Sequence, residues 1–257
     1  MQERITEALD AIEHENSVRV LYACESGSRA WGFESVDSDF DVRFLYLRPT
    51  RWYLSIRPGR DVIERPVDEG LDVSGWDLQK ALGLLGKSNP PLLEWLQSPI
   101  VYREVESATR RLRGLIPEYY SPVSCFHHYL HMAEGNYRKY LRGDEVWVKK
   151  YFYVLRPVLA CQWIERGLGV VPTEFSRLVD RLLEEPGLRR DIEALLRAKR
   201  NGQELDRGPR IDSISEFLER ELERLAEVRP ERPEKQDSKA LDRAFVAILS
   251  EVNGSSL

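Results

Sequence analysis

The sequence of 257 residues is poor in cysteine and contains only Cys24, Cys125 and Cys161. Thiols so far apart form neither a disulfide framework nor a zinc-ligand spacing, so we expect buried free thiols. No apolar run approaches the roughly 20 residues that a membrane-spanning helix needs. The charged N-terminus lacks the hydrophobic segment of a secretory signal. Together these absences predict a cytoplasmic protein that does not contact a membrane.

A strong net charge is also missing, because 38 Lys and Arg residues oppose 43 Asp and Glu residues, which leaves −5. This balance argues against a general nucleic-acid coat protein. A local basic groove is still allowed, because affinity for phosphate follows the charges near a site. Neither a low-complexity tract nor an internal repeat is present. The length is comfortable for two domains.

The pattern of the sequence changes near residue 103. Before it, short runs rich in branched and aromatic residues alternate with Gly, Pro, Ser and Asp, which is typical of strands and turns. After it, the periodicity is helical nearly throughout. We therefore predict an α+β protein with a small mixed sheet and flanking helices in 1–103 and an all-α domain in 104–257. The predicted strands are 18–23, 40–47, 61–67 and 70–73, with helices over 5–13 and 76–85 and another that begins at Pro90.

In the second half, a Pro-rich and charged stretch at 229–236 is typical of a linker. The segment after it, 238–249, carries an apolar face that we expect to dock onto the helical bundle. Ser213 and Glu216 have the spacing of a capping box at the start of a helix. The other helices are expected over 121–141, 147–166, 173–183 and 188–200.

The most informative segment joins two predicted strands. The first strand runs into Gly27-Ser28, and the next opens with Asp39-Phe40-Asp41. Alternation along a strand places Asp39 and Asp41 on one face, where the two carboxylates repel each other unless a cation lies between them. A hard divalent ion such as Mg²⁺ meets that demand. Gly27 allows close backbone approach to a ligand, and Ser28 with nearby N–H groups can hold phosphate oxygens.

A third carboxylate is needed from a neighbouring strand if two metal ions about 3.5–4 Å apart are to be held. Asp72 is the candidate, because it lies in an apolar, strand-like context where an unpaired acid would be costly. Asp77 is the competitor. It lies at the start of the 76–85 helix, however, where an acid is favourable for structural reasons alone.

Gly27-Ser28 followed by Asp39-Phe40-Asp41 resembles the signature of the DNA polymerase beta-type nucleotidyltransferase superfamily. Longer segments resemble the predicted bacterial and phage nucleotidyltransferases associated with RNA ligase and RNA repair. This resemblance spans roughly residues 17 to 180. It rests on the longer string within 27–43 and on the segments 72–78, 88–96 and 149–157.

The resemblance implies a nucleotidyltransferase domain in 1–103 and a helical domain that closes the nucleotide and acceptor cleft. It implies that Gly27 and Ser28 contact the β- and γ-phosphates of an NTP, ATP before the others. Asp39 and Asp41 would hold two Mg²⁺ ions, for which Mn²⁺ can substitute. Asp72 would complete the catalytic and metal site and help to activate the attacking hydroxyl. The reaction would transfer NMP to that hydroxyl and release pyrophosphate.

A second group of candidate nucleotide-binding residues is Lys149, Lys150, Tyr153 and Arg156. Positions 149, 153 and 156 share one face of a helix, so the cations would neutralise a triphosphate while Tyr153 stacks on a base or sugar. A solvated helix face with tyrosines at the edge of the core is the alternative. The role of Arg29 is open in the same way, because its guanidinium is suited either to binding a phosphate or to forming an ion pair with Glu34 or Asp37.

The acceptor divides the functional hypotheses. Modification of an RNA end in repair, tRNA included, comes first. It rests on family analogy and on two basic helices, the one with Lys149 to Arg156 and the preceding one with Arg138, Lys139 and Arg142. Transfer of AMP to a protein side chain, as in antitoxin-like members of the superfamily, comes second. A catalytically silent module that binds nucleotide is the third. The sequence leaves the base preference and the oligomeric state open.

Overall fold

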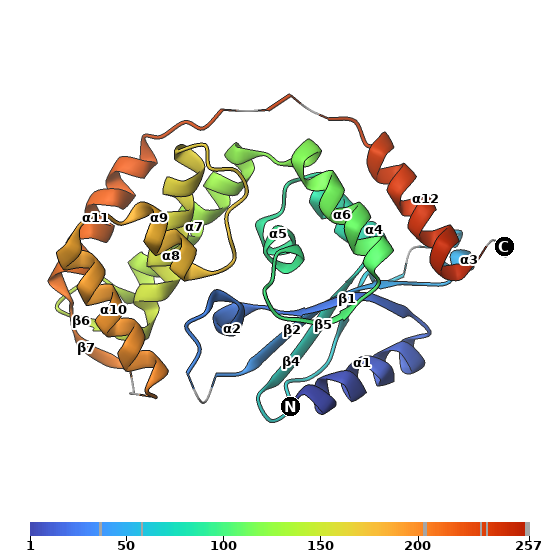
Figure 1. Cartoon of the computed structure of the whole chain (residues 1–257), viewed down its shortest axis with the longest axis horizontal. Helices are drawn as coiled ribbons and strands as arrows, with labels where there is room; N and C mark the ends of the chain where they lie inside the picture. The colour runs from blue at the N-terminus through green and yellow to red at the C-terminus, as the bar shows by residue number, and fades with distance from the viewer. Residues whose placement is uncertain (36–37, 58, 203–204, 232, 235, 255–257) are drawn as a thin grey trace. The chain divides into compact units, whose positions relative to one another are not determined.

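The structure, a computed structural model, describes all residues except 36–37, 58, 203–204, 232, 235 and 255–257 (Figure 1). It confirms the α+β class, and the chain divides into two compact units. The first unit comprises Met1–Ala30, Asp39–Tyr120 and Glu234–Leu257, and the second comprises Trp31–Ser38 and Ser121–Pro233. The units therefore do not divide at the boundary predicted between residues 103 and 104.

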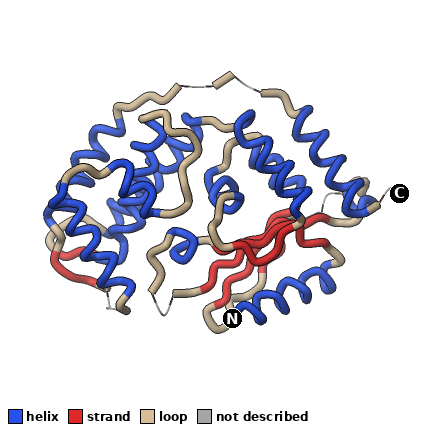
Figure 2. The backbone as a smooth tube through the Cα atoms, viewed as in Figure 1, coloured by secondary structure: helices blue, strands red, loops and turns tan. Residues whose placement is uncertain are grey.

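The first unit is built on a five-stranded mixed sheet with the order β3-β4-β2-β1-β5, drawn red in Figure 2. β2 and β4 are parallel, whereas all the other neighbours are antiparallel. Both strands of the parallel pair therefore begin at the same edge of the sheet. The strands are β1 (Arg19–Glu25), β2 (Phe40–Leu47), β3 (Val62–Glu64), β4 (Leu71–Asp77) and β5 (Val101–Glu104).

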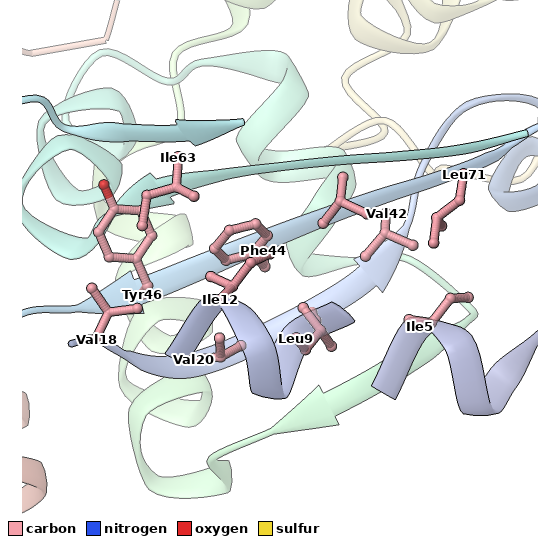
Figure 3. Packing of buried hydrophobic residues seen from close by; sticks show 12 residues of the cluster. Ile5, Leu9, Ile12, Val18, Val20, Val42, Phe44, Tyr46, Ile63 and Leu71 are labelled. Carbon is pink, nitrogen blue, oxygen red and sulfur yellow. The ribbon is translucent and has the colours of Figure 1, made fainter. Parts of the chain in front are cut away.

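Helix α1 (Gln2–Asn16) covers one face of this sheet (Figures 1 and 3). Its buried residues Ile5, Leu9 and Ile12 recur at helical spacing and pack against apolar side chains of the strands. On β2, Val42 and Phe44 point into this cluster. Strand alternation therefore directs Asp41 and Arg43 to the opposite face.

Three helices cover the opposite face: α4 (Leu78–Leu85), α5 (Pro90–Leu96) and α6 (Glu106–Tyr119). Trp76 on β4 stacks on Trp95 of α5 with the ring centroids 3.8 Å apart. Asn89 caps α5 through the Leu92 amide, as its position before two prolines indicates. Asp77 caps α4, and its side chain accepts from the Gln79 amide. The short helices α2 (Gly27–Trp31) and α3 (Thr50–Tyr53) lie in the connections that flank β2.

The last helix, α12 (Lys239–Asn253), packs on α4 and α6 of the sheet unit. The docking of this helix onto the helical bundle was therefore predicted wrongly. Leu241 and Ile248 of its apolar face are buried, and Tyr119 Oη donates to the Asp237 carbonyl at 2.7 Å just before it. Helical periodicity defines an apolar face, but it does not say which surface that face covers.

The second unit is organised around α8 (Phe152–Glu165), which is buried on nearly all sides and contacts α7, α9 and α11. It also holds a two-stranded sheet, so the expectation of an all-α second domain is corrected. Ile211 precedes α11, and Ser213 Oγ donates to Asp191 Oδ2 at 2.6 Å, so the predicted capping box is absent. The other elements are α7 (Pro122–Tyr140), β6 (Glu145–Trp147), η1 (Val148–Tyr151), α9 (Phe175–Leu182), α10 (Pro186–Arg200), β7 (Arg207–Pro209) and α11 (Asp212–Ala226).

Candidate active site

Two of the predicted carboxylates lie side by side on the parallel strand pair. Asp41 of β2 and Asp72 of β4 are register partners in the ladder. Their strand neighbours Val42 and Val73 point into the core beneath α1, so both acids project from the opposite face. Their side chains are 30% and 33% exposed. The parallel register thus brings together two acids that are 31 positions apart in the sequence.

Asp39 lies immediately before β2 and is exposed. The Phe40 amide donates to the Gly70 carbonyl at 2.7 Å, which holds the start of β2 against the approach to β4. A Cβ atom built on Gly70 would lie 3.2 Å from Asp39 Oδ1. Asp39 is therefore close to the backbone that leads to Asp72.

The three acids influence one another electrostatically. Burial raises the pKa of the Asp41 carboxyl, and the charges of Asp72 and Asp39 raise it further. The Arg43 guanidinium opposes these effects and lowers the same pKa. An added cation would favour the ionised form of Asp41 for the same reason.

The Gly27-Ser28 turn lies against Asp41. Gly27 has φ +60°, a conformation that side-chain-bearing residues rarely adopt, and a Cβ atom built there would overlap Asp41 Oδ2. The Ser26 amide donates to the Asp41 carbonyl at 2.8 Å. Ser28 follows in the short helix α2 and is half-buried. A side chain at this position would therefore strain the backbone and displace the Asp41 carboxylate.

A buried fourth acid, Glu25, supports the site from the end of β1. Its side chain accepts a hydrogen bond from the Asp41 amide at 2.8 Å and another from the Tyr102 hydroxyl. Ser98 Oγ donates to its carbonyl at 2.7 Å. Burial raises the pKa of Glu25, and both hydrogen bonds to its carboxylate lower it. Glu25 therefore fixes the backbone at Asp41.

Arg43 occupies the space between the two aligned carboxylates. Its Nη2 lies 2.7 Å from Asp72 Oδ2 and 3.2 Å from Asp41 Oδ1. Its Nη1 donates to the Val42 and Asp72 carbonyls at 3.1 and 3.2 Å. The side chain is only 19% exposed. One guanidinium thus balances the charge of both acids.

The chemistry of the donors fits a divalent metal ion, although the site is not preassembled for one. Among the residues that the structure describes, no group of three His, Cys, Asp or Glu side chains is arranged to hold a metal. The guanidinium of Arg43 takes the position between the acids instead. Asp41 and Asp72 still offer hard carboxylate oxygens in register, with Asp39 nearby, and such oxygens suit Mg²⁺ and Mn²⁺.

Arg29 lies beside the first of these acids. Its Nε donates to the Asp39 carbonyl at 3.2 Å, and its guanidinium lies 3.7 Å from the centroid of the Phe40 ring. Of the two acids considered as ion-pair partners, Asp37 lies outside the described residues. A phosphate-binding role for Arg29 therefore stays a proposal, which its position next to Asp39 supports.

The basic residues of the second unit were predicted to lie on one helix, but the structure divides them between two elements. Lys149 and Lys150 lie in the 3₁₀ turn η1, and only Tyr153 and Arg156 lie in α8. The helix starts late because the Val148 and Lys149 amides donate to the Asp206 and Leu205 carbonyls. Lys150 Nζ lies 4.4 Å from the centroid of the Tyr153 ring.

Arg156 does not share an exposed face with Lys149 and Tyr153, so that prediction is wrong. Its side chain is 1% exposed, and its guanidinium lies 4.7 Å from the centroid of the Trp31 ring. Nη2 donates to the Thr173 carbonyl at 3.3 Å. Packing inside the helical unit, rather than access to a phosphate, accounts for these contacts.

Lys199 of α10 is affected by the charges of Lys149 and Lys150. Its Nζ lies 4.7 Å from the centroid of the Phe33 ring and 5.4 Å from that of Phe152. Burial lowers the pKa of Lys199 to about 8, with repulsion by Lys149 and Lys150 assisting and Glu34 opposing. Lys149, Lys150 and Lys199 therefore form a group of mutually repelling cations, which we call the lysine cluster.

Sequence reasoning missed Arg43, Glu25 and Lys199. A signal for Arg43 was present, because positions 39, 41 and 43 alternate onto one face of the same strand. Glu25 directly precedes the Ser26-Gly27-Ser28 turn, but nothing local shows that it is buried. Lys199 lies 49 positions after Lys150, and only the packing of α10 brings it near.

Comparison with known proteins identifies the family to which the chain belongs. The profile of the family RlaP, described as the RNA repair pathway DNA polymerase beta family, matches residues 1–247. The chain belongs to this family, which confirms the resemblance found in the sequence. The uncharacterized protein YcgL of Bacillus subtilis (strain 168) is 50% identical over 254 residues, which cover 98% of each chain.

Among solved structures, the nucleotidyltransferase-like protein of Exiguobacterium sibiricum 255-15 aligns over 96% of this chain and 90% of its own. The TM-score is 0.31 and the sequence identity is 12%. In the described part of the chain, no helix is both long enough and apolar enough to cross a membrane.

Proposed function

We propose that this protein is a Mg²⁺-dependent nucleotidyltransferase that transfers NMP from an NTP to a hydroxyl group at an RNA end and releases pyrophosphate. One observation carries the proposal. In a chain of the polymerase beta family, Asp41 and Asp72 stand in register on adjacent parallel strands and contact the same cationic group.

The three acids and four residues near them have separate roles in the proposed reaction. Asp39, Asp41 and Asp72 hold the metal ions, and Glu25 keeps the Asp41 backbone in place. Gly27 and Ser28 bring backbone N–H groups close to the phosphates, which Arg29 also contacts. When bound, the metal would lower the pKa of the attacking hydroxyl and steady the leaving pyrophosphate.

The lysine cluster and Tyr153 supply the second part of the proposal. Closely spaced ammonium groups repel one another, and the attraction of a polyanion that binds between them offsets that repulsion. The partly exposed ring of Tyr153 next to Lys150 favours nucleotides, because a base stacks on an aromatic face for about 1–3 kcal/mol. We therefore propose that the cluster binds the phosphates of the nucleotide or of the RNA acceptor.

Transfer of radiolabel from each α-labelled NTP to total RNA, in the presence of Mg²⁺, tests the function directly. Label is expected in RNA, with ATP as the preferred donor and equimolar pyrophosphate released. Asp41→Asn and Asp72→Asn should each reduce transfer at least about 100-fold. Asp10→Asn is the matched control, because Asp10 is an exposed acid on α1, across the sheet from the site.

The same assay with total protein as acceptor distinguishes the alternatives. Label in protein and none in RNA would replace the RNA acceptor by a side-chain hydroxyl, while the metal site would be retained. NTP binding without metal, with no pyrophosphate released on any acceptor, would indicate a silent nucleotide-binding module and would contradict the enzymatic proposal.

A further inference from the structure

The guanidinium of Arg43 is held by four acceptors on two strands, two carboxylate oxygens and two carbonyl oxygens. A planar guanidinium suits such an array, because its fork of N–H groups can serve several oxygens at once. A surface arginine in a simple ion pair has no comparable set of hydrogen-bond acceptors. The position of Arg43 is therefore built into the strand pair.

The same oxygens are the ones that a divalent ion would need. Nη2 contacts Asp72 Oδ2 and Asp41 Oδ1, so the side chain lies between the aligned carboxylates. A guanidinium and a divalent cation repel each other at such short range. Both cannot be bound by these two oxygens, so binding of one excludes the other.

Without a cation, the acids would repel each other across the ladder, because like charges directly opposite destabilise a sheet. Arg43 removes that repulsion from within the chain. It comes from the same strand as Asp41, two positions later, so it is present whenever the strand pair forms.

We propose that Arg43 is an internal substitute for the divalent cation. It joins Asp41 and Asp72 in the metal-free protein and leaves their oxygens when a divalent ion binds, so it sets the metal affinity of the site. The inference rests on the proposed metal site. It adds a positioning residue that competes with the metal rather than one that binds it.

The released guanidinium would lie next to a divalent ion, and this arrangement is unfavourable unless an anion lies between the two positive charges. A triphosphate provides that anion. Arg43 therefore makes binding of the metal and of the nucleotide mutually favourable, because each lowers the cost of displacing the guanidinium.

Titration of the full chain with Mn²⁺ alone, followed by the loss of the electron paramagnetic resonance signal of free Mn²⁺, tests the proposal. Arg43→Gln is expected to bind Mn²⁺ about tenfold more tightly than the wild type, which is about 1.4 kcal/mol. Its melting temperature in EDTA should be lower than that of the wild type. Saturating Mn²⁺ should raise the melting temperature of Arg43→Gln by more than it raises that of the wild type.

Two further variants separate competition with the metal from ordinary structural support. Arg43→Lys keeps the charge without the fork, so its Mn²⁺ affinity should lie between those of wild type and Arg43→Gln. Arg103→Gln is the matched control, because Arg103 lies on β5 of the same sheet, is 22% exposed and pairs with Asp10 and Glu13. It should lower stability and leave Mn²⁺ affinity unchanged.

The results distinguish this inference from the proposed function. If the wild type and Arg43→Gln bind Mn²⁺ equally, or the variant binds less, Arg43 is a structural ion pair and the inference is wrong. If Arg43→Gln does not fold, the Mn²⁺ affinity of Arg43→Lys is compared with that of the wild type instead, and equal or weaker binding by the variant again contradicts the inference. If none of these proteins binds Mn²⁺, the metal site itself is refuted and the inference with it. Binding by Arg43→Gln alone would support the inference in its strongest form.

Discussion

At the scale of single residues, the site depends on a glycine whose replacement would strain the backbone and shift a carboxylate. Gly27 combines a positive φ with contact against Asp41 Oδ2, whereas most glycines of the chain have one property or neither. The backbone conformation favours glycine, and the carboxylate removes the room for a side chain. The turn that approaches the phosphates in our proposal is thus coupled to the position of a metal ligand.

Gly27→Ala is expected to destabilise the protein by about 1–3 kcal/mol and to reduce nucleotide transfer at least about tenfold. The strain arises from φ, and the loss of activity arises because the new methyl group displaces the Asp41 carboxylate. Urea denaturation and the transfer assay measure the two effects. Gly32→Ala is the control, since Gly32 has φ +81° and a Cβ atom built there would meet no atom within 4 Å. Equal losses of activity in both variants would contradict the role of the Asp41 contact.

At the scale of elements, the sequence predicted best what local pattern determines. β2 was predicted with its observed bounds, because its apolar run ends at acidic and Pro-containing turns. Strand alternation placed Asp41 on the correct face, and Asp77 was recognised as a helix-start residue. β5 was missed because a four-residue edge strand with charged residues has no clear alternation.

What the sequence did not reveal depends on pairing between distant segments. The alignment of Asp41 with Asp72 follows from the parallel register of β2 and β4, which neither strand specifies alone. The 3₁₀ turn at Lys149 follows from backbone pairing with Leu205 and Asp206. The burial of Arg156 against Trp31 likewise arises only when the helical unit packs.

The lysine cluster predicts a proton uptake that accompanies binding of a polyanion. The pKa of Lys199 is lowered to about 8 by burial and by its lysine neighbours, so at pH 8 this ammonium group is about half deprotonated. Bound tripolyphosphate restores the charged form, so binding at pH 8 should take up about half a proton. Isothermal titration in two buffers with different ionisation heats measures the uptake.

The sign of the effect is specific to a lowered lysine pKa. At Lys199 the unfolded chain binds more protons than the folded protein between pH 8 and the ordinary lysine pKa, so this residue contributes a rise in stability with pH across that window. Burial raises the pKa of the Cys24 and Cys161 thiols, which contributes a fall in stability over the same window, so the contribution of Lys199 is measured as the difference between wild type and Lys199→Met. Lys199→Met should abolish both the proton uptake and this contribution. Lys239→Met, which alters an exposed lysine of α12, should change neither. Identical binding heats in both buffers would contradict the prediction.

At the scale of the whole molecule, the first unit is assembled from three separated stretches of chain. Glu234–Leu257 belongs to the unit that carries the acids, although 113 residues of the other unit precede it. Asn253 Nδ2 donates to the Arg48 carbonyl at 2.9 Å, and Phe245 packs edge-on against Tyr53 with the ring centroids 5.0 Å apart. The support of the sheet thus comes from both ends of the sequence.

This arrangement predicts where the effect of a mutation in α12 appears. Ile248 is 1% exposed, so Ile248→Ala should cost about 2–4 kcal/mol through lost burial and a cavity. Val246 on the same helix is 59% exposed, so Val246→Ala should cost no more than about 0.5 kcal/mol. Hydrogen exchange should show the lost protection of Ile248→Ala in α4, α6 and the five-stranded sheet, with α7, α8 and α11 unchanged. Loss of protection in the second unit instead would contradict the packing of α12 on α4 and α6 as the source of its stabilising effect.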